Sequence, residues 1–496
     1  MEDVGVSLEN LKKLLDEQLA KETNPEKRQA LEDRLEELNA AERGYYMARL
    51  KSALERSDLP PYDALVANGE RVLEPENKAK LTEAVTHLDL LPPPPTADDF
   101  MASATANYAL ERYEAALADL NQALNLRPDY HEALNNRGII YRHLERYDES
   151  LADYNRALAL RPDDPDTLNN RGVTYGSLKR YDEALADYNR SLALRPDHPD
   201  TLSNRGVAYD SLKRYDEALA NYNRSLALRP DHPDTLYNRG VTYGSLKRYD
   251  DALADYNRCL ALRPDHPDTL NNRGVTYYSL KRYDEALADY NRSLQLRPDH
   301  PDTLNNSGLT YDSLKRYDEA LADYNRALAL RPDHPDTLNN RGVTYYSLKR
   351  YDEALADLNQ ALNLRPDYHE ALNNRGMIYR HLERYEEALV DYNRALQLRP
   401  DHPDTLNNRG ATYSKMARYD EALSDFNQAL KIKPDYPDVV YNKACFFSLK
   451  HKPKDAISYL EKAIGLDEKC RQDAATESDF DNIRDNPHFK KLIAGD

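Results

Sequence analysis

Apolar and polar positions along most of the chain recur with a period of 34 residues. In residues 165–198, a first group of apolar residues at helical spacing is followed by a basic turn, Lys179-Arg180, and by a second group. Pro165 suits the first turn of a helix, and Pro196 stops the second one. A fixed period of this size predicts a solenoid of two-helix units, each burying its apolar seam against its neighbours.

The units follow one another without insertion over residues 97–470. We number the places of a unit from 1 at Pro165 to 34 at His198. Place 8 is glycine in most units, but it is Ala104 in the first and Ala444 in the last, as expected for terminal repeats that act as caps. The eleven units begin at residues 97, 131, 165, 199, 233, 267, 301, 335, 369, 403 and 437.

The residues before the repeats have a different pattern. Residues 1–90 predict a helical domain that opens with a hairpin, in which Ser7 is a possible N-cap and Asn24-Pro25 begins a second helix that reaches about Leu54. Two shorter helices are expected over 62–73 and 77–88, followed by a stiff proline-rich linker over 91–96. This domain could shield the end of the solenoid, or it could be a module for self-association.

The residues after the repeats, 471–496, place Phe480, Ile483, Phe489 and Leu492 at helical spacing. We expect helices there that cover the open apolar edge of the last repeat.

Three features of the unit 165–198 carry packing predictions. Gly172 is small enough for the two helices to approach closely. Arg171 is expected to lie along the helix pair and to reach a carboxylate such as Asp187. Lys179 stands in the turn, where a left-handed backbone conformation would cost up to about 1 kcal/mol.

The spaced residues of this unit resemble the tetratricopeptide repeat (TPR) family. Leucine, glycine and tyrosine on the first helix, then alanine, tyrosine, a small residue and proline, match its pattern at Leu168, Gly172, Tyr175, Ala184, Tyr188, Ser191 and Pro196. The resemblance covers 97–470 and implies an all-α fold, a right-handed superhelix whose first helices line a concave groove. Such arrays are typical of protein-interaction scaffolds.

Composition excludes several functions. The formal net charge of −18 disfavours nucleic acid as a partner. The acidic start is not typical of a signal peptide, and no apolar run is long enough to span a membrane, so a cytoplasmic protein is expected. The three cysteines have no metal-ligand spacing, and no phosphate loop or catalytic motif is present. We therefore expect neither an enzyme nor a cofactor.

Asparagine fills two neighbouring places on the first helices. In TPR proteins, places 2, 5, 6, 9, 12 and 13 tend to face the groove, and an amide there can both donate to and accept from a peptide bond. The array is in this respect similar to that of O-GlcNAc transferase, without the transferase domain. The predicted peptide-binding asparagines are Asn136, Asn170, Asn204, Asn238, Asn272, Asn306, Asn340, Asn374, Asn408 and Asn442 at place 6, and Asn169, Asn271, Asn305 and Asn339 at place 5. Alternatively, they bridge adjacent units.

Selectivity is expected where the units differ, above all at place 12. Its predicted contact residues are Arg142, Asp210, Tyr278, Asp312, Tyr346 and Arg380. Because place 2 is acidic in every unit, the groove should favour an extended polar or basic segment of a protein. Two other functions stay open: a regulatory subunit that docks an enzyme through residues 1–90, and an assembly spacer that binds no ligand.

Overall fold

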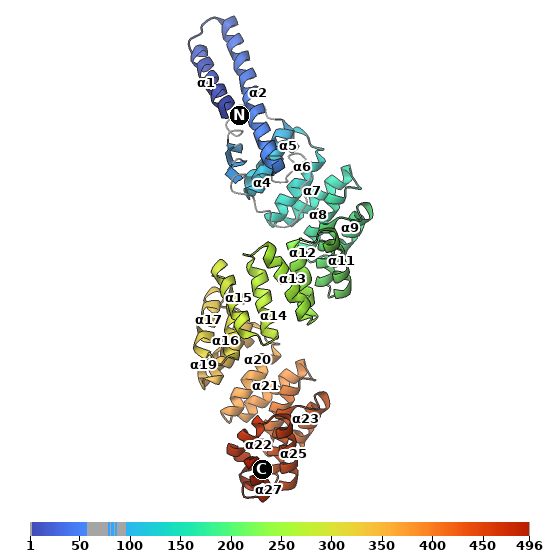
Figure 1. Cartoon of the computed structure of the whole chain (residues 1–496), viewed down its shortest axis with the longest axis vertical. Helices are drawn as coiled ribbons and strands as arrows, with labels where there is room; N and C mark the ends of the chain where they lie inside the picture. Colours follow the sequence, from blue (N-terminus) through green and yellow to red (C-terminus); the bar gives the residue numbers. More distant parts are fainter. Residues whose placement is uncertain (1, 57–77, 80, 84, 87–95, 496) are drawn as a thin grey trace. The chain divides into compact units, whose positions relative to one another are not determined.

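The computed structural model describes residues 2–56, 78–79, 81–83, 85–86 and 96–495. These residues form helices joined by short turns, and no strand occurs among them, so the predicted all-α solenoid is confirmed (Figure 1). The chain forms two compact units, Met1–Pro264 and Asp265–Asp496. The helix expected over 62–73 lies outside the described residues, as does the linker 91–96 except for residue 96. Of the helix expected over 77–88, residues 78–79, 81–83 and 85–86 are described, and they are helical.

The N-terminal hairpin consists of α1 (Glu2–Leu19) and α2 (Pro25–Arg56). Asn24 caps α2 as predicted, because its Oδ1 accepts hydrogen bonds from the backbone nitrogens of residues 26 and 27, at 3.0 and 3.2 Å. The prediction of an N-cap at Ser7 is wrong: α1 begins at Glu2 and runs through residue 7. This serine therefore lies inside the helix and does not start it.

The last turns of α2 pack on the first repeat. Met47, Leu50 and Leu54 join one buried cluster with Ala102 and Ala106 of α4 (Ala97–Ala109). This contact covers apolar surface that the first repeat has no preceding repeat to cover. Farther out on the hairpin, Leu11 and Leu14 of α1 are about half exposed.

The repeats are pairs of antiparallel helices of nearly constant length. In Met1–Pro264 the pairs are α4 and α5 (Tyr113–Leu126), α6 (His131–His143) and α7 (Tyr147–Leu160), α8 (Pro165–Ser177) and α9 (Tyr181–Leu194), α10 (Pro199–Ser211) and α11 (Tyr215–Leu228), and α12 (Pro233–Ser245) and α13 (Tyr249–Leu262).

In Asp265–Asp496 the same pairing continues. The pairs are α14 (Pro267–Ser279) and α15 (Tyr283–Leu296), α16 (Pro301–Ser313) and α17 (Tyr317–Leu330), α18 (Pro335–Ser347) and α19 (Tyr351–Leu364), α20 (His369–His381) and α21 (Tyr385–Leu398), α22 (Pro403–Lys415) and α23 (Tyr419–Ile432), and α24 (Pro437–Leu449) and α25 (Pro453–Leu466).

The turn between the two helices of a pair contains one residue whose backbone adopts the left-handed conformation. Lys179 has a φ of 59°, and the residue at place 15 of every described repeat is likewise in this region although none is glycine. The backbone nitrogen of Arg180 donates back to the carbonyl of Tyr175 at 2.8 Å, which closes the turn. A carbonyl at the end of the first helix is thereby satisfied.

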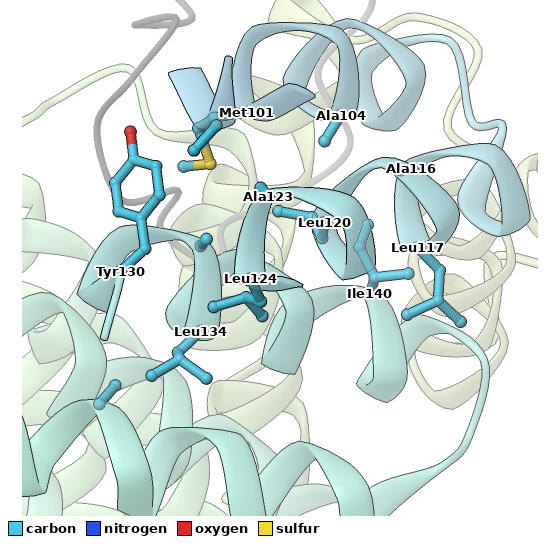
Figure 2. Close-up of a cluster of buried hydrophobic side chains, with 13 residues drawn as sticks. Met101, Ala104, Ala116, Leu117, Leu120, Ala123, Leu124, Tyr130, Leu134 and Ile140 are labelled. Atoms are coloured by element: carbon cyan, nitrogen blue, oxygen red, sulfur yellow. The ribbon is translucent and has the colours of Figure 1, made fainter. Parts of the chain in front are cut away.

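The closest approach of the two helices lies at place 8. A Cβ atom on Gly172 would stand 2.6 Å from the ring of Tyr188, whose side chain is buried. Where place 24 is leucine instead, place 8 tolerates alanine: Figure 2 shows Ala104 on α4 facing α5, which carries Leu120. The side chains at places 8 and 24 therefore fill one limited space, so a larger residue at one place requires a smaller residue at the other.

Arginine at place 7 clamps the two helices together. Arg171 donates from Nε and Nη2 to the two oxygens of Asp187, both at 2.7 Å, as predicted from the sequence, and from Nη1 to Asn155 of the preceding repeat at 2.7 Å. Such a two-pronged pair matches the geometry of a carboxylate. The same pairs are Arg137–Asp153, Arg239–Asp255, Arg273–Asp289, Arg341–Asp357, Arg375–Asp391 and Arg409–Asp425.

The interior repeat of α16 and α17 lacks the arginine of this clamp. Ser307 stands at place 7 of α16, and within the described part of the chain the salt-bridge partner of Asp323 is Arg326, at 3.5 Å. Burial raises the pKa of the Asp323 carboxyl above its ordinary value.

Restoring the clamp by Ser307→Arg is expected to raise the free energy of unfolding by about 1 kcal/mol, because hydrogen bonds to a charged group contribute about that much. Urea denaturation of the full chain measures the change. Ser307→Lys is the matched control, since lysine adds the positive charge but cannot donate to both carboxylate oxygens through a planar guanidinium group. If both variants stabilise equally, the geometry of the clamp is not what matters.

The C-terminal tail consists of α26 (Lys469–Thr476), the 3₁₀ turn η1 (Ser478–Ile483) and α27 (Pro487–Ala494). Phe480, Ile483 and Phe489 enter one buried cluster with Val440 and Leu460 of the last repeat. The tail thus packs on the apolar edge of that repeat. The single 3₁₀ turn within it was not predicted.

Candidate functional site

The asparagines at places 5 and 6 bond to one another along consecutive first helices. Asn340 Nδ2 donates to Asn305 Oδ1 of the preceding repeat at 3.1 Å, and Asn374 Nδ2 donates to Asn339 Oδ1 at 2.9 Å. Within a repeat, Asn339 Nδ2 donates to Asn340 Oδ1 at 3.3 Å. The amides therefore form a continuous hydrogen-bonded row, and they hold neighbouring repeats in register.

The same bond between repeats recurs in both units. In each case the later asparagine donates from Nδ2 to Oδ1 of the earlier one. The pairs, with the donor first, are Asn170–Asn135, Asn204–Asn169, Asn306–Asn271, Asn408–Asn373 and Asn442–Asn407.

The row changes where place 5 is not asparagine. Ser203 accepts a hydrogen bond from Thr235 Oγ1 of the next repeat at 2.9 Å. At the start of the array, Asn136 Nδ2 donates to Met101 Sδ at 3.7 Å. Asn136, Asn169 and Asn170 lie deep between helices, since their side chains are almost fully buried.

An asparagine amide has two N–H donors and an oxygen with two lone pairs. Asn340 and Asn374 are both only partly buried. Asn340 uses one donor toward Asn305 and one lone pair toward Asn339. The row therefore does not exhaust the hydrogen-bonding capacity of such an amide.

The residues at place 12 contact the following repeat. Asp210 and Asp312 accept hydrogen bonds from Thr242 and Thr344, at 2.6 and 2.8 Å. Tyr278 lies 3.1 Å from Ser313 through its hydroxyl. These side chains thus both face their neighbours and vary between repeats.

The other three predicted contact residues at place 12 behave differently. Tyr346 packs against the rings of Tyr351 and His381, at 5.9 and 6.0 Å between centroids. The Nε atoms of Arg142 and Arg380 are buried without a hydrogen-bond partner in the described part of the chain.

A cavity of about 340 Å³ lies within Asp265–Asp496, along four consecutive repeats. It brings together four of the predicted site residues, Asp312, Asn339, Asn340 and Asn374. Its other lining residues are Leu309, Val343, Glu370, Asn373, His402 and Asp404. They come from α16, α18 and α20 and from the start of α22. The other predicted site residues do not line this cavity.

Four lining residues that the sequence analysis did not name occupy places of the repeat from which they could have been predicted. Leu309 and Val343 occupy place 9, and Glu370 and Asp404 occupy place 2, which are groove-facing places in the resemblance. The sequence places the predicted contacts at the asparagines and at place 12, and these four residues occupy neither. His402 could not have been predicted in this way, because it precedes its helix.

The lining of this cavity is acidic. It contains the carboxylates of Asp312, Glu370 and Asp404 and no lysine or arginine. Burial raises the pKa of Asp312 above its ordinary value, although the hydrogen bond from Thr344 opposes that rise. Asp404 also accepts from the hydroxyl of Tyr436. A cationic group entering here would face these three carboxylates, which attract it.

Other kinds of site are not found among the described residues. No group of three or more histidine, cysteine, aspartate or glutamate side chains there is arranged to hold a metal ion. No helix in the described part of the chain combines the length and apolar character that crossing a bilayer requires.

In-register helix pairs of 34 residues define a tandem-repeat α-solenoid. Family models described as "Tetratricopeptide repeat" match residues 129–197, 163–231, 197–265, 231–299, 265–333, 299–367, 367–435 and 437–470, and one described as "TPR repeat" matches 105–144. These matches span well over half of the chain, which therefore belongs to the tetratricopeptide repeat family. No curated protein matches it.

Solved structures similar to the chain share little sequence with it. YrrB, described as a TPR protein with an unusual peptide-binding site, is 23% identical over 37% of this chain and 95% of its own, with a TM-score of 0.32. The APC/C hetero-tetramer Cut9-Hcn1 is 15% identical over 91% and 96%, with a TM-score of 0.48. A TPR protein from Parabacteroides merdae is 20% identical over 50% and 98%, with a TM-score of 0.41.

Proposed function

We propose that this protein is a non-catalytic interaction scaffold that binds an extended segment of a partner protein along the first helices of Asp265–Asp496. TPR proteins generally mediate protein–protein interactions. The observation that carries the proposal is the cavity along α16, α18, α20 and α22, which combines amides, aliphatic side chains and carboxylates. This mixture suits a peptide, because it offers partners to the backbone as well as to side chains.

The amide row supplies the contact with the peptide backbone. Asn340 and Asn374 hold adjacent repeats through one hydrogen bond each, and the remaining capacity of each amide is directed to the ligand. Because these amides are already fixed by their neighbours, little side-chain entropy is lost when a peptide binds.

The side chains around the row select a basic segment. Leu309 and Val343 offer aliphatic surface to the stem of a lysine or arginine, and Asp312, Glu370 and Asp404 attract its charged end. Acidic peptides are disfavoured by the same carboxylates, so the selectivity has both an attractive and a repulsive part.

Selection of a phage-displayed library of random linear peptides against the full chain tests this proposal. Peptides rich in lysine and arginine are expected to be enriched. The double variant Leu309→Arg/Val343→Arg fills the cavity and repels basic groups, so it should bind the selected peptides at least about tenfold more weakly, a loss of about 1.4 kcal/mol.

The matched control is Val390→Arg, which adds the same side chain at an exposed position of α21 outside the cavity lining. It should bind like the unchanged protein. If no peptide is enriched, or if the double variant binds as well as the control, the cavity is not a peptide site. A spacer that binds no ligand, or docking through residues 1–90, would then be the better account.

A further inference from the structure

The residue before the first helix of a repeat, at place 34, is histidine in several repeats. His198 precedes α10 in an extended conformation, and its Nδ1 accepts a hydrogen bond from the backbone nitrogen of Thr201 at 3.2 Å. His402 makes the same bond to Thr405 at 3.3 Å ahead of α22. Each imidazole therefore acts as the N-cap of its helix, a role usually filled by serine, threonine, aspartate or asparagine. His266, His300 and His334 cap their helices in the same way.

The cap bond requires one protonation state of the ring. Nδ1 of each histidine also lies 2.9 Å from the hydroxyl of the same threonine, which can donate to it as well. A backbone N–H only donates, so Nδ1 must keep its lone pair and the proton of the neutral ring lies on Nε2. A charged imidazolium has hydrogens on both nitrogens and cannot accept from Thr201 or Thr405. Its positive charge would also face the positive end of the helix dipole.

Charged groups of both signs face His198. Asp166 of α8 lies 4.0 Å from its Nε2, and Asp200 lies in the first turn of α10, the helix that this histidine caps. Each of these carboxylates already pairs with an arginine, Asp166 with Arg195 at 2.8 Å and Asp200 with Arg229 at 3.0 Å. Burial of the ring, with help from the two arginines, lowers the pKa of His198 below its ordinary value of 6.5 against the pull of the two carboxylates.

His402 has similar surroundings. Asp404 lies 4.0 Å from its Nε2, the ring of His369 is 5.6 Å away between centroids, and Glu370 and Arg399 also face it. Burial, Arg399 and His369 together lower the pKa of His402, while Asp404 and Glu370 oppose them. Since His402 also lines the cavity along α16, α18 and α20, its protonation would change the charge of that cavity.

We propose that His198 and His402 are acid-sensitive caps, each holding the start of a first helix and its junction with the preceding repeat only while the imidazole is neutral. Protonation removes the cap and places a positive charge at the helix start. The array then loosens at defined junctions on acidification, and at α22 this occurs beside the cavity.

The direction of the effect follows from proton uptake. In the unfolded chain a histidine titrates near 6.5, whereas both folded-state values lie lower. Between these values the unfolded chain binds more protons, so stability falls as the pH falls. The contribution of the caps is complete above about pH 6.5 and is lost on acidification below it.

The chain contains its own replacement for the histidine. Asp164 stands at place 34 before α8, and its Oδ2 accepts from the backbone nitrogen of Thr167 at 2.7 Å. Aspartate keeps both its cap and its negative charge at mildly acidic pH. His198→Asp and His402→Asp are therefore expected to fold and to remove the response to acid.

Nuclear magnetic resonance of the full chain with nitrogen-15-labelled histidine tests the proposed ring states. The signals of His198 and His402 are assigned by their loss in the two aspartate variants. We expect the Nε2–H tautomer at alkaline pH and titration midpoints below 6.5. The Nδ1–H tautomer, or a midpoint at or above that value, would overturn the proposal.

Urea denaturation at about pH 7.5 and about pH 5.5 tests the consequence for stability. The midpoint of the unchanged protein should fall between the two values, and it should fall less in His198→Asp/His402→Asp. His488→Asp, at an exposed position of the tail, should fall as the unchanged protein does. Equal losses in the double variant and the unchanged protein would refute the acid-sensitive caps.

Discussion

Gly240→Ala is expected to lower the free energy of unfolding by about 2 kcal/mol, because it overpacks the closest contact of its helix pair. The new Cβ atom would stand 2.6 Å from Cε1 of Tyr256. The Tyr256 side chain, on α13, is only 2% exposed, so its ring can shift only by displacing neighbouring atoms. The gain in helix propensity from glycine to alanine, about 1 kcal/mol, offsets only part of the strain. Urea denaturation of the full chain measures the net change.

Gly342→Ala is the matched control within the same chain. Its Cβ atom would meet Leu358 Cγ at 3.1 Å rather than an aromatic ring, and a leucine can shift by a few tenths of an ångström. We expect the stability to stay within about 0.5 kcal/mol of the original. The terminal repeats already pair alanine with leucine here, as Ala444 and Leu460 show.

A double-mutant cycle separates the contact from other effects. In the Tyr256→Leu background, Gly240→Ala should cost almost nothing, which gives a coupling of about 2 kcal/mol between the two places. If Gly240→Ala costs the same in both backgrounds, or if Gly342→Ala is as harmful as Gly240→Ala, the ring contact does not explain the glycine.

Arg375→Ala is expected to cost about 3 kcal/mol, because it leaves a buried carboxylate without its partner. Arg375 donates to both oxygens of Asp391, at 2.7 and 2.6 Å, and to Asn359 at 2.7 Å. The Asp391 side chain is only 3% exposed, so water cannot replace the lost bonds. Thermal and urea denaturation at neutral pH measure the loss.

Arg375→Ala/Asp391→Asn isolates the charge from the lost packing. Asparagine already occupies the place of Asp391 in one repeat, where Asn221 accepts from Arg205 at 2.8 Å. The double variant should be more stable than Arg375→Ala alone, since no unpaired charge remains. A double variant that is no more stable than the single one would mean that lost packing, and not the buried charge, dominates.

The sequence predicted those features that local chemistry decides. Proline at place 1 begins a first helix where the repeat pattern puts it, and Lys179 lies in the turn between the two helices, where the sequence left its backbone conformation open. The pair of Arg171 with Asp187 could be predicted because two adjacent helices of fixed length bring places 7 and 23 together. Sixteen residues separate these places in every repeat, so the pairing follows from the fold.

The sequence could not decide how side chains on one surface share their hydrogen bonds. Asn305 and Asn340 both occupy places expected to face the groove. That the Asn340 amide donates to the Asn305 amide is seen only in the structure. The place of His402 was also beyond prediction, since a histidine rarely caps a helix and its ring could equally have pointed to solvent. Which asparagines line a cavity depended on residues several repeats apart.

The row of asparagines has a direction, and this bears on how repeats can be gained by duplication. In the asparagine bonds described above the later repeat donates and the earlier one accepts, as Asn442 does to Asn407. A repeat with asparagine at places 5 and 6 therefore carries both an acceptor for the next repeat and a donor for the one before. A copy inserted in the interior in the same orientation brings both partners with it, and the hydrogen bonds on either side of it are preserved.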